Sequence, residues 1–269
     1  MADWRMLKPE RHDAFMNMAI DEAVLTARIE DRAPNTLRLY RWKPSAVSIG
    51  KFQTIEKEVQ VDNCRKLGVD VVRRITGGGT VYHDAEDEIT YSVVAEKASL
   101  GAQDVAAVYA KICAALAEAL KILGIQADFN EGNAKTCPNL TVRGRKISGS
   151  AQCHKNGVVL QHGTLLLDAN LHRMFTLLRV PWSRTCVEVV NVAKDRITSV
   201  NRELGDTVPL ERVRQALTVG FQKGLNMKLA VGELTLHEHE LARKLYVKKY
   251  GTDSWNLQGK DILEKRNIV

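Results

Sequence analysis

The sequence predicts an α+β fold, in which a mixed and largely antiparallel β-sheet is flanked by helices. Two patterns support this prediction. Short stretches rich in β-branched residues lie between turn residues, and longer stretches repeat apolar residues every three or four positions. Strand and helix patterns do not alternate regularly along the chain, which argues against a parallel sheet built from repeated βαβ units.

The first half of the chain contains both patterns. A helical period over residues 14–30 follows His12 and Asp13, which are the possible cap residues. A second helical period, over residues 56–68, ends at Gly68, and glycine commonly ends helices. The expected strands cover residues 36–42, 46–52 and 69–75, and an acidic turn separates two further extended pieces between 81 and 97.

The second half begins with the clearest helix. Apolar residues recur at helical spacing from Asp104 to Leu123, and Gly124 follows them. Between residues 139 and 168, three strands with turns at "RG" and "HKNG" predict an antiparallel meander. The rest is expected to be mostly helical, with helices over residues 209–225 and 235–251.

A short polar stretch, "LGDTVP", marks a possible boundary near residue 204. We expect residues 1–204 to form the main domain. Residues 205–269 are expected to form a C-terminal helical segment that packs on the same domain.

The composition limits the classes of function. With 269 residues, of which 45% are hydrophobic, the chain is long enough to bury a large core. Its apolar runs are far shorter than the roughly 20 residues that span a bilayer, and its first residues are charged. We therefore expect a cytoplasmic protein that does not bind membranes.

The charge of the chain predicts an acidic partner. The formal net charge is +7, but aromatic residues make up only 6% of the chain and no nucleic-acid-reading helix is recognisable. We therefore expect no nucleic acid among the partners. The five cysteines include no C-x-x-C pair, so we expect free thiols and no metal site.

Three consecutive glycines, Gly77–Gly79, occur within "RRITGGGTVYHD", between two expected strands. Their spacing matches neither a P-loop nor a dinucleotide-binding fingerprint. The glycines could simply allow positive φ angles in a tight connection. A turn needs only one or two glycines, however, whereas a run without Cβ atoms lets a ligand lie against the backbone, so binding is the favoured interpretation.

This motif and two others, "GRKISGSAQ" and "QHGTLLLD", resemble the superfamily of lipoate-protein ligases and octanoyltransferases, whose fold is shared with biotin-protein ligases. The similarity extends from about Phe15 to "KKYGTDSWN" near the end of the chain. It implies an acyl-transfer catalytic domain over residues 1–204. The implied reaction attaches octanoyl or lipoyl to a lysine of an E2 lipoyl domain or of glycine cleavage H protein, partners whose acidity suits the positive charge.

The resemblance also implies roles for residues of the three motifs. Gly77, Gly78 and Gly79 would line a slot for the acyl chain, because bare backbone can lie close to an apolar chain. Lys146 would reach the acyl carbonyl or an acyl adenylate. The further substrate-binding residues implied are Arg73 and His83 in the first motif, Gly149 in the second, and His162 and Gly163 in the third.

Two chemistries occur in this superfamily. A ligase activates free lipoate with ATP and Mg²⁺ as an acyl adenylate. A transferase takes octanoyl from acyl carrier protein onto a cysteine as a thioester, passes it to the lysine, and needs no cofactor. The transferase therefore requires a reactive thiol.

Four of the five cysteines are weak candidates for that thiol. Cys64 and Cys113 lie in expected helices, where a free cysteine is usually a small buried hydrophobic residue. Cys153 follows Lys146 by seven residues, so the two side chains would point to opposite faces if the strand is regular. Cys186 lies in no recognised motif.

Cys137 is the strongest candidate. It lies in "NAKTCPNL", before an expected strand, and the charges of Lys135 and Lys146 would favour its thiolate form. Cysteine octanoyltransferases of the Gram-positive type, which the sequence most resembles, carry their nucleophile in this loop. We therefore expect Cys137 and Lys146 to be the catalytic residues of an octanoyltransferase. An ATP-dependent, single-domain lipoate-protein ligase and a non-catalytic acyl- or carrier-binding protein remain as alternatives.

Overall fold

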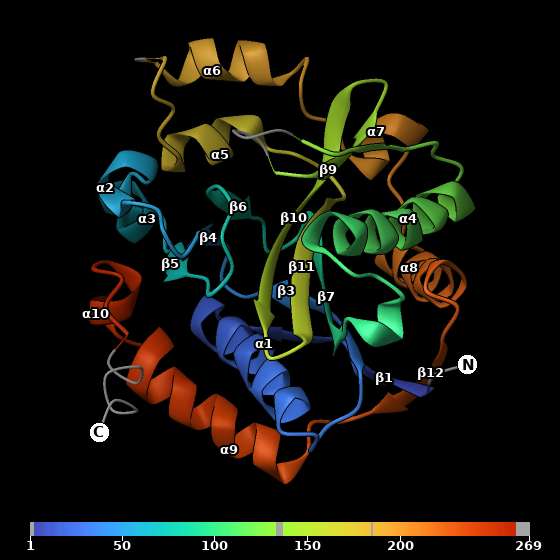
Figure 1. Ribbon diagram of the computed structural model, residues 1–269. Helices are drawn as coiled ribbons and strands as arrows, with labels where there is room; N and C mark the ends of the chain where they lie inside the picture. The colour runs from blue at the N-terminus through green and yellow to red at the C-terminus, as the bar shows by residue number, and fades with distance from the viewer. Residues whose placement is uncertain (1–2, 133–136, 184, 262–269) are drawn as a thin grey trace.

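A computed structural model describes residues 3–132, 137–183 and 185–261 of this protein (Figure 1). Its described residues form two sheets. The larger has nine strands, in the order β12-β1-β3-β7-β11-β10-β9-β8, with β2 also paired to β3. Its strands are β1 (Asp3–Leu7), β2 (Glu10–His12), β3 (Thr36–Trp42), β7 (Glu88–Glu96), β8 (Asp128–Asn130), β9 (Asn139–Val142), β10 (Arg145–Lys155), β11 (Val158–Leu166) and β12 (Lys228–Gly232). The smaller has the order β5-β4-β6, formed by β4 (Ala46–Ile49), β5 (Asp70–Arg73) and β6 (Val81–His83).

The pairing directions confirm the predicted fold class. Strands from β3 through β7, β11, β10 and β9 to β8 are antiparallel, whereas β12, β1, β3 and β2 pair in parallel. The sheet is therefore mixed and largely antiparallel, and the meander of β9, β10 and β11 is confirmed.

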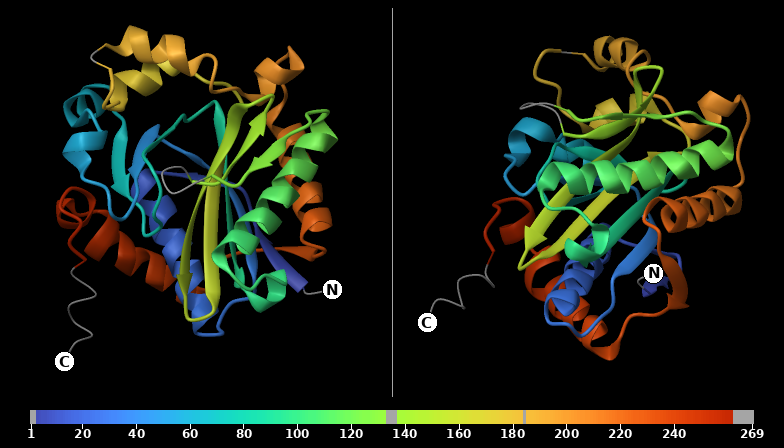
Figure 2. Two further views of the ribbon diagram at one scale, coloured as in Figure 1. Left: turned by 45° about the horizontal axis from the view of Figure 1, so that its top comes forward. Right: turned by 45° about the vertical axis from the view of Figure 1, so that its right-hand side comes forward.

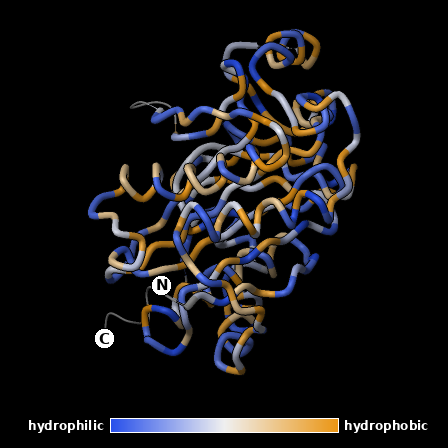
Figure 3. The backbone as a smooth tube through the Cα atoms, turned by 90° about the vertical axis from the view of Figure 1, so that its right-hand side faces the viewer, coloured by the Kyte–Doolittle hydropathy of each residue, from blue (hydrophilic) through white to orange (hydrophobic). Residues whose placement is uncertain are grey.

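Helices cover both faces of the larger sheet (Figures 1 and 2). On one face, α4 (Val105–Leu123) and α8 (Leu210–Gly224) pack on a core of apolar side chains from β3, β7 and β11. On the other, α1 (Ala14–Ile29) packs with α9 (Leu236–Leu245), which continues into the π-helical turn η2 (Tyr246–Tyr250). Figure 3, which views the side of α4 and α8, shows apolar and polar residues following each other along the turns, as one-sided burial requires.

Shorter helices complete the fold. Those on the side of the smaller sheet are α2 (Ile55–Glu58), α3 (Val61–Lys66), α5 (Leu171–Leu177), α6 (Cys186–Ala193) and α10 (Asp253–Asn256). The other two are η1 (Ala98–Leu100) and α7 (Val200–Leu204). In the part of the chain that the structure describes, none of the helices has the length and apolar character needed to cross a membrane.

The caps predicted for the long helices are confirmed. Asp13 accepts a hydrogen bond from the Met16 amide at the start of α1, and Asp104 accepts one from the Ala107 amide at the start of α4. Gly124 ends α4 with a φ of 94°, a left-handed conformation that suits glycine.

Two expectations about secondary structure are wrong. The helix expected over residues 56–68 is broken into α2 and α3, because Val59 is extended and forms a β-bridge with Leu178. The C-terminal part, expected to be mostly helical, contributes β12 to the larger sheet by parallel pairing with β1. In both cases a partner far away in sequence decides the local conformation. The boundary at residue 204 stays a prediction.

The glycine segment does not close a hairpin between β5 and β6, because β4 lies between these strands. Gly77–Gly79 instead pass the end of β4. There the backbones are in close contact, since a Cβ on Gly50 would stand 2.2 Å from the Gly78 carbonyl oxygen. The close approach therefore requires glycine at position 50, whereas Gly78 is favoured by its own backbone, whose φ is 89°.

Candidate active site

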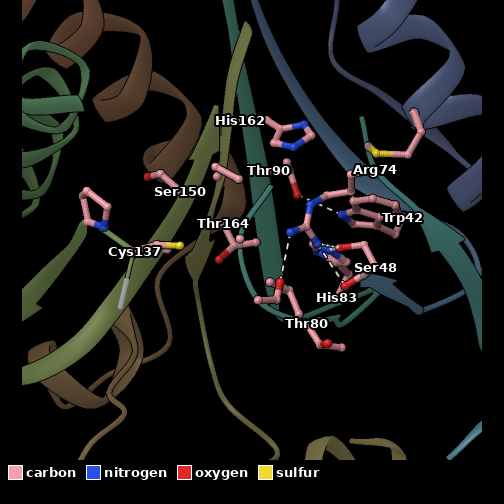
Figure 4. A pocket seen from close by; sticks show the side chains of 18 of the residues that line it. Trp42, Ser48, Arg74, Thr80, His83, Thr90, Cys137, Ser150, His162 and Thr164 are labelled. Carbon is pink, nitrogen blue, oxygen red and sulfur yellow. Dashed lines mark hydrogen bonds between the residues drawn. The ribbon is translucent and has the colours of Figure 1, made fainter. Parts of the chain in front are cut away.

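A cavity lies between the smaller sheet and the face of the larger sheet that α1 covers (Figure 4). It contains about 570 Å³ of empty space, partly open to solvent, which is within the usual range for small-molecule sites. Trp42 on β3, Ser48 on β4 and Met18 on α1 contribute to its walls. It is therefore formed by segments that are far apart in the sequence.

The cavity brings together most of the residues that the three motifs predicted. Those that line it are Gly78, Gly79, His83, Cys137, Lys146, Gly149, His162 and Gly163. Gly77 does not line the cavity. Its carbonyl oxygen accepts a hydrogen bond from Arg74, which does line the cavity.

Arg73 also lies outside the cavity, so the expectation that it lines the cavity is wrong. Its neighbour Arg74 lines the cavity in its place. The Arg73 guanidinium donates to the carbonyl oxygens of Gln53 and Trp255, at 2.7 and 3.0 Å, so it joins the smaller sheet to the C-terminal segment. Successive side chains of a strand point to opposite faces. Arg74 follows the end of β5 and enters the cavity from the other side, a position that sequence reasoning missed although the motif contains both arginines.

Cys137 is exposed and directs its sulfur toward the cavity, across from Arg74 (Figure 4). A Cβ placed on Gly78 would stand 3.5 Å from the Cys137 sulfur. The glycine segment therefore leaves space directly beside the thiol. Lys135, the other lysine expected near this thiol, lies outside the described residues.

Lys146 reaches the cavity because β10 contains a bulge. Pairing with β9 shifts between Lys146 and Ser148, and the backbone of Lys146 bonds instead to the segment before α7. Its amide donates to the Arg196 carbonyl at 2.8 Å, and its own carbonyl accepts from the Thr198 amide at 2.9 Å. The extra residue turns the Lys146 side chain to the face of Gly149, where a Cβ would stand 2.8 Å from Nζ.

The same bulge overturns the argument used against Cys153. Since one residue is inserted between Lys146 and Ser148, Lys146 and Cys153 belong to the same face of β10 and not to opposite faces. Cys153 is nevertheless not among the residues that line the cavity and packs against the core under α1. Burial raises the pKa of its thiol, which disfavours a nucleophilic role.

The remaining cysteines lie elsewhere. Cys64 and Cys113 are buried, as expected, and burial raises the pKa of each thiol to about 11. Cys186 begins α6 and places its sulfur 3.7 Å from the His172 carbonyl oxygen. Cys137 is thus the cysteine that the described structure places at the cavity.

Two cationic groups approach the cavity: Arg74, which is buried, and Lys146, whose side chain keeps part of its surface exposed. Burial lowers the pKa of Arg74 to about 10, and Cys137 is the largest influence in the opposite direction. Removal from water lowers the pKa of Lys146 below its usual value, Cys137 opposes this change, and Arg74 adds to it. A lysine with a lowered pKa is more often neutral and can accept a proton. The arrangement therefore combines a thiol, an amine and a slot walled partly by backbone.

Two histidines complete the polar end of the cavity, and each joins a hydroxyl to a carboxylate. His83 lies 2.7 Å from the Ser48 hydroxyl and 2.8 Å from Glu88. The partners of His162 are arranged in the same way: its ring nitrogens lie 2.8 Å from the Thr76 hydroxyl and 2.9 Å from Asp21. Sequence reasoning selected the two histidines through their motifs but missed their partners, which lie on other elements. Among the described residues, no group of three or more His, Cys, Asp or Glu side chains is arranged to hold a metal ion.

Comparison with known proteins agrees with this geometry. The chain is 38% identical to the octanoyltransferase LipM of Kyrpidia tusciae, over 95% of this chain and 99% of that protein. It is 32% identical to the octanoyltransferase LipM of Clostridioides difficile, over the same shares. A bi-partite lipoate protein ligase of Thermoplasma acidophilum, studied with its E2 lipoyl domain, superimposes with a TM-score of 0.84 at 29% identity, covering 97% of this chain and 98% of that one.

These similarities confirm the resemblance seen in the motifs and the expected fold. The family model of the lipoyl protein ligase A/B catalytic domain matches residues 13–222, which is most of the chain. The chain therefore belongs to the lipoyl protein ligase A/B catalytic domain family.

Proposed function

We propose that this protein is an octanoyltransferase that moves an octanoyl group from acyl carrier protein, through a thioester on Cys137, to a lysine of a lipoyl domain or of glycine cleavage H protein. The observation that carries this proposal is the place of Cys137, an exposed thiol at the mouth of a glycine-walled cavity that also contains Lys146. The names of the relatives from Kyrpidia tusciae and Clostridioides difficile, both octanoyltransferases, support it.

The first step charges the enzyme. The Cys137 sulfur attacks the carbonyl carbon of the carrier thioester and forms a new carbon–sulfur bond. The bond to the carrier's sulfur breaks, and the carrier leaves as a thiolate that takes up a proton. The octanoyl chain, which has no hydrogen-bonding groups, lies in the slot beside Gly78 and Gly79.

The second step transfers the acyl group. The ε-amine of the acceptor lysine attacks the same carbonyl carbon, the amide bond forms, and the bond to the Cys137 sulfur breaks. The proton lost by the amine passes to Lys146, whose lowered pKa makes its neutral form available as a base. Neither step consumes a nucleotide, so the reaction needs no ATP and no metal ion.

The partners follow from the same chemistry and from charge. The formal net charge of +7 favours encounter with acidic carriers and acidic lipoyl domains. The cytoplasm, where acyl carrier protein would be available, is the proposed location.

An ATP-dependent lipoate-protein ligase is the second candidate, because the superimposed Thermoplasma acidophilum protein is a ligase. That activity would require ATP and Mg²⁺ and would not require Cys137. A non-catalytic carrier-binding protein would have no use for a thiol and a lysine in one cavity, so Cys137 and Lys146 argue against it.

One experiment separates the three. A lipoyl domain is incubated with this protein and octanoyl-loaded acyl carrier protein, with and without ATP, and its mass is measured. Octanoylation without ATP is the expected result. Modification that needs ATP and free lipoate would identify a ligase instead, and binding without modification would identify a carrier-binding protein.

A further inference from the structure

The guanidinium of Arg74 is the centre of a branched hydrogen-bond system at the polar end of the cavity. Its Nη2 donates to the carbonyl oxygens of Gly77 and Gly79, both at 2.9 Å. Its Nη1 donates to the Ser48 carbonyl at 3.0 Å and to the Ser48 hydroxyl at 2.8 Å, and its Nε donates to the Thr76 hydroxyl at 3.3 Å. These bonds use all the N–H groups of an arginine side chain. Arg74 is thus fixed in one orientation and holds the glycine segment.

The direction of the hydrogen bonds beyond Ser48 follows from this arrangement. A guanidinium can only donate, so the Ser48 oxygen accepts from Arg74, and its hydroxyl proton is free to be donated to a neutral His83 at Nε2. His83 then carries its proton on Nδ1 and donates it to Glu88. The chain therefore runs from Arg74 through Ser48 and His83 to a buried carboxylate.

A second chain repeats this pattern through Thr76. The Thr76 hydroxyl accepts from Arg74 and donates to His162 Nε2, and His162 Nδ1 donates to Asp21. Protonation of His162 would direct a new N–H group at the Thr76 hydroxyl, which already accepts from Arg74. Burial is the main cause that lowers the pKa of His162, and Arg74 adds to it.

No carboxylate of the described chain pairs directly with Arg74. The groups that favour its charge are Cys137 first, then Tyr40 and Tyr109. Burial raises the pKa of Tyr40 well above its usual value and that of Tyr109 to about 12, so both phenols stay neutral near pH 7. Cys137 is then the group that can supply the missing negative charge.

The geometry agrees with that pairing. A Cβ on Gly78 would stand 3.5 Å from Arg74 Nη2 and 3.5 Å from the Cys137 sulfur. Arg74 Nη2 and the Cys137 sulfur are therefore no farther apart than twice this distance. An opposite charge at such a distance favours the charged form of a thiol.

We propose that Arg74 is the resident counter-charge of the Cys137 thiolate, and that the Ser48–His83–Glu88 and Thr76–His162–Asp21 chains orient it. This inference rests on the proposed function in one respect, the use of Cys137 as the nucleophile. The positive charge of Arg74 stabilises the negative charge on the Cys137 sulfur. Ser48, Thr76 and the two histidines are positioning residues that hold the Arg74 side chain in place. Charged or titratable groups whose pKa Cys137 influences come from three elements: Arg74 beyond β5, Lys146 on β10 and Tyr109 on α4.

The test is the rate at which iodoacetamide alkylates Cys137 in the full-length protein, measured against pH by mass spectrometry of the Cys137 peptide. In Arg74→Gln, the midpoint of the pH profile moves upward by about one unit, and the rate at pH 7 falls about tenfold. Arg74→Lys, which keeps the charge but not the planar fork, recovers part of the rate.

Arg73→Gln is the matched control, because Arg73 is the preceding residue and is also buried, but its guanidinium lies outside the cavity. Its alkylation profile stays within about twofold of the original. A folded Arg74→Gln protein with an unchanged profile would overturn the proposal. An equal shift in Arg73→Gln would also overturn it, because the effect would then reflect general disturbance of this strand.

A second pair of variants tests the hydrogen bonds that orient Arg74. This pair also tests the proposal if Arg74→Gln does not fold. Thr76→Val removes the shared hydroxyl at nearly constant volume and lowers the rate at pH 7 about threefold, and Thr76→Ser restores it. Equal rates and pH profiles in the valine and serine variants would contradict the orienting role. Alkylation needs no acyl donor, so these results stand apart from the proposed function, which fails separately if octanoyl carrier protein leaves no adduct on Cys137.

Discussion

The side chain of Lys146 lies directly over Gly149, where a Cβ would stand 2.8 Å from both Cε and Nζ. The bulge in β10 produces this contact, because it turns Lys146 to the same face as Gly149. The absence of a side chain at position 149 thus leaves the space that the Lys146 amine occupies in the cavity.

Gly149→Ala is therefore expected to displace the end of Lys146 and to slow acyl transfer about tenfold or more, because small misplacements of a catalytic group are costly. The backbone of Gly149 is not in the left-handed region and the clash is with a flexible side-chain end, so the midpoint of thermal unfolding changes little. Kinetics and thermal unfolding of the same sample check both statements. Full activity in Gly149→Ala would show that the position of the Lys146 amine does not matter.

The glycine slot is tested best at Gly79. Gly78 lines the cavity, but its φ of 89° would strain any side chain, so a valine there would also disturb the backbone. Gly79 lines the cavity, has no such φ, and a Cβ on it would meet no atom within 4 Å. Gly79→Val should narrow the slot without strain.

We expect Gly79→Val to reduce the rate with octanoyl donors by about tenfold and with butanoyl donors much less, because only the longer chain reaches the narrowed part. Gly77→Val, in which the Cβ also meets no atom and the position does not line the cavity, should have the smaller effect. An equal loss for short and long donors would contradict a slot at Gly79.

The pH dependence of the second step tests the role of Lys146. Since the pKa of Lys146 lies below its usual value, its neutral form appears at lower pH than for an ordinary lysine. Transfer from preformed acyl-enzyme should therefore rise with pH as Lys146 loses its proton. In Lys146→Arg the added group stays protonated, so this rise disappears and the rate falls about 10²-fold or more. A Lys146→Arg protein with the original rate and profile would mean that only the positive charge is needed.

Trp255 tests how the C-terminal segment supports the site. This side chain is buried, its Nε1 donates to the Arg73 carbonyl at 2.8 Å, and its own carbonyl accepts from Arg73. Trp255→Ala should lower the free energy of unfolding by about 3–5 kcal/mol. Trp182 is 60% exposed, and Trp182→Ala should change stability by less than about 0.5 kcal/mol. Chemical denaturation of the two variants checks this difference, and equal losses would contradict it.

Local patterns predicted the long elements well. The helices at 14–30 and 104–123 were recognisable because their spacing, their aspartate caps and, for the second, its final glycine all agree. The break at Val59 and the strand β12 were not recognisable, since each depends on a partner far along the chain, Leu178 and β1 respectively. Pairing of this kind leaves little trace in a short stretch of sequence.

The site was predicted only in part, because some of its features also depend on contacts between segments that are far apart in the sequence. Motifs identified Cys137, Lys146 and both histidines, but the choice between Arg73 and Arg74 depends on which face of β5 meets the cavity. Both arginines are buried, so burial alone would not have separated them. The bulge that aims Lys146 is likewise set by the segment around Thr198, more than fifty residues later.

The central claim is that Cys137 carries the acyl group, and intact mass spectrometry after mixing with octanoyl-loaded acyl carrier protein tests it most directly. The account predicts one octanoyl adduct on the protein, stable in acid, released by hydroxylamine, mapped to Cys137 and absent from Cys137→Ser. Iodoacetamide should also alkylate Cys137 before the four other cysteines, and prior octanoylation should protect it. The account is contradicted if no adduct forms and Cys137→Ser still modifies a lipoyl domain when ATP and lipoate are supplied.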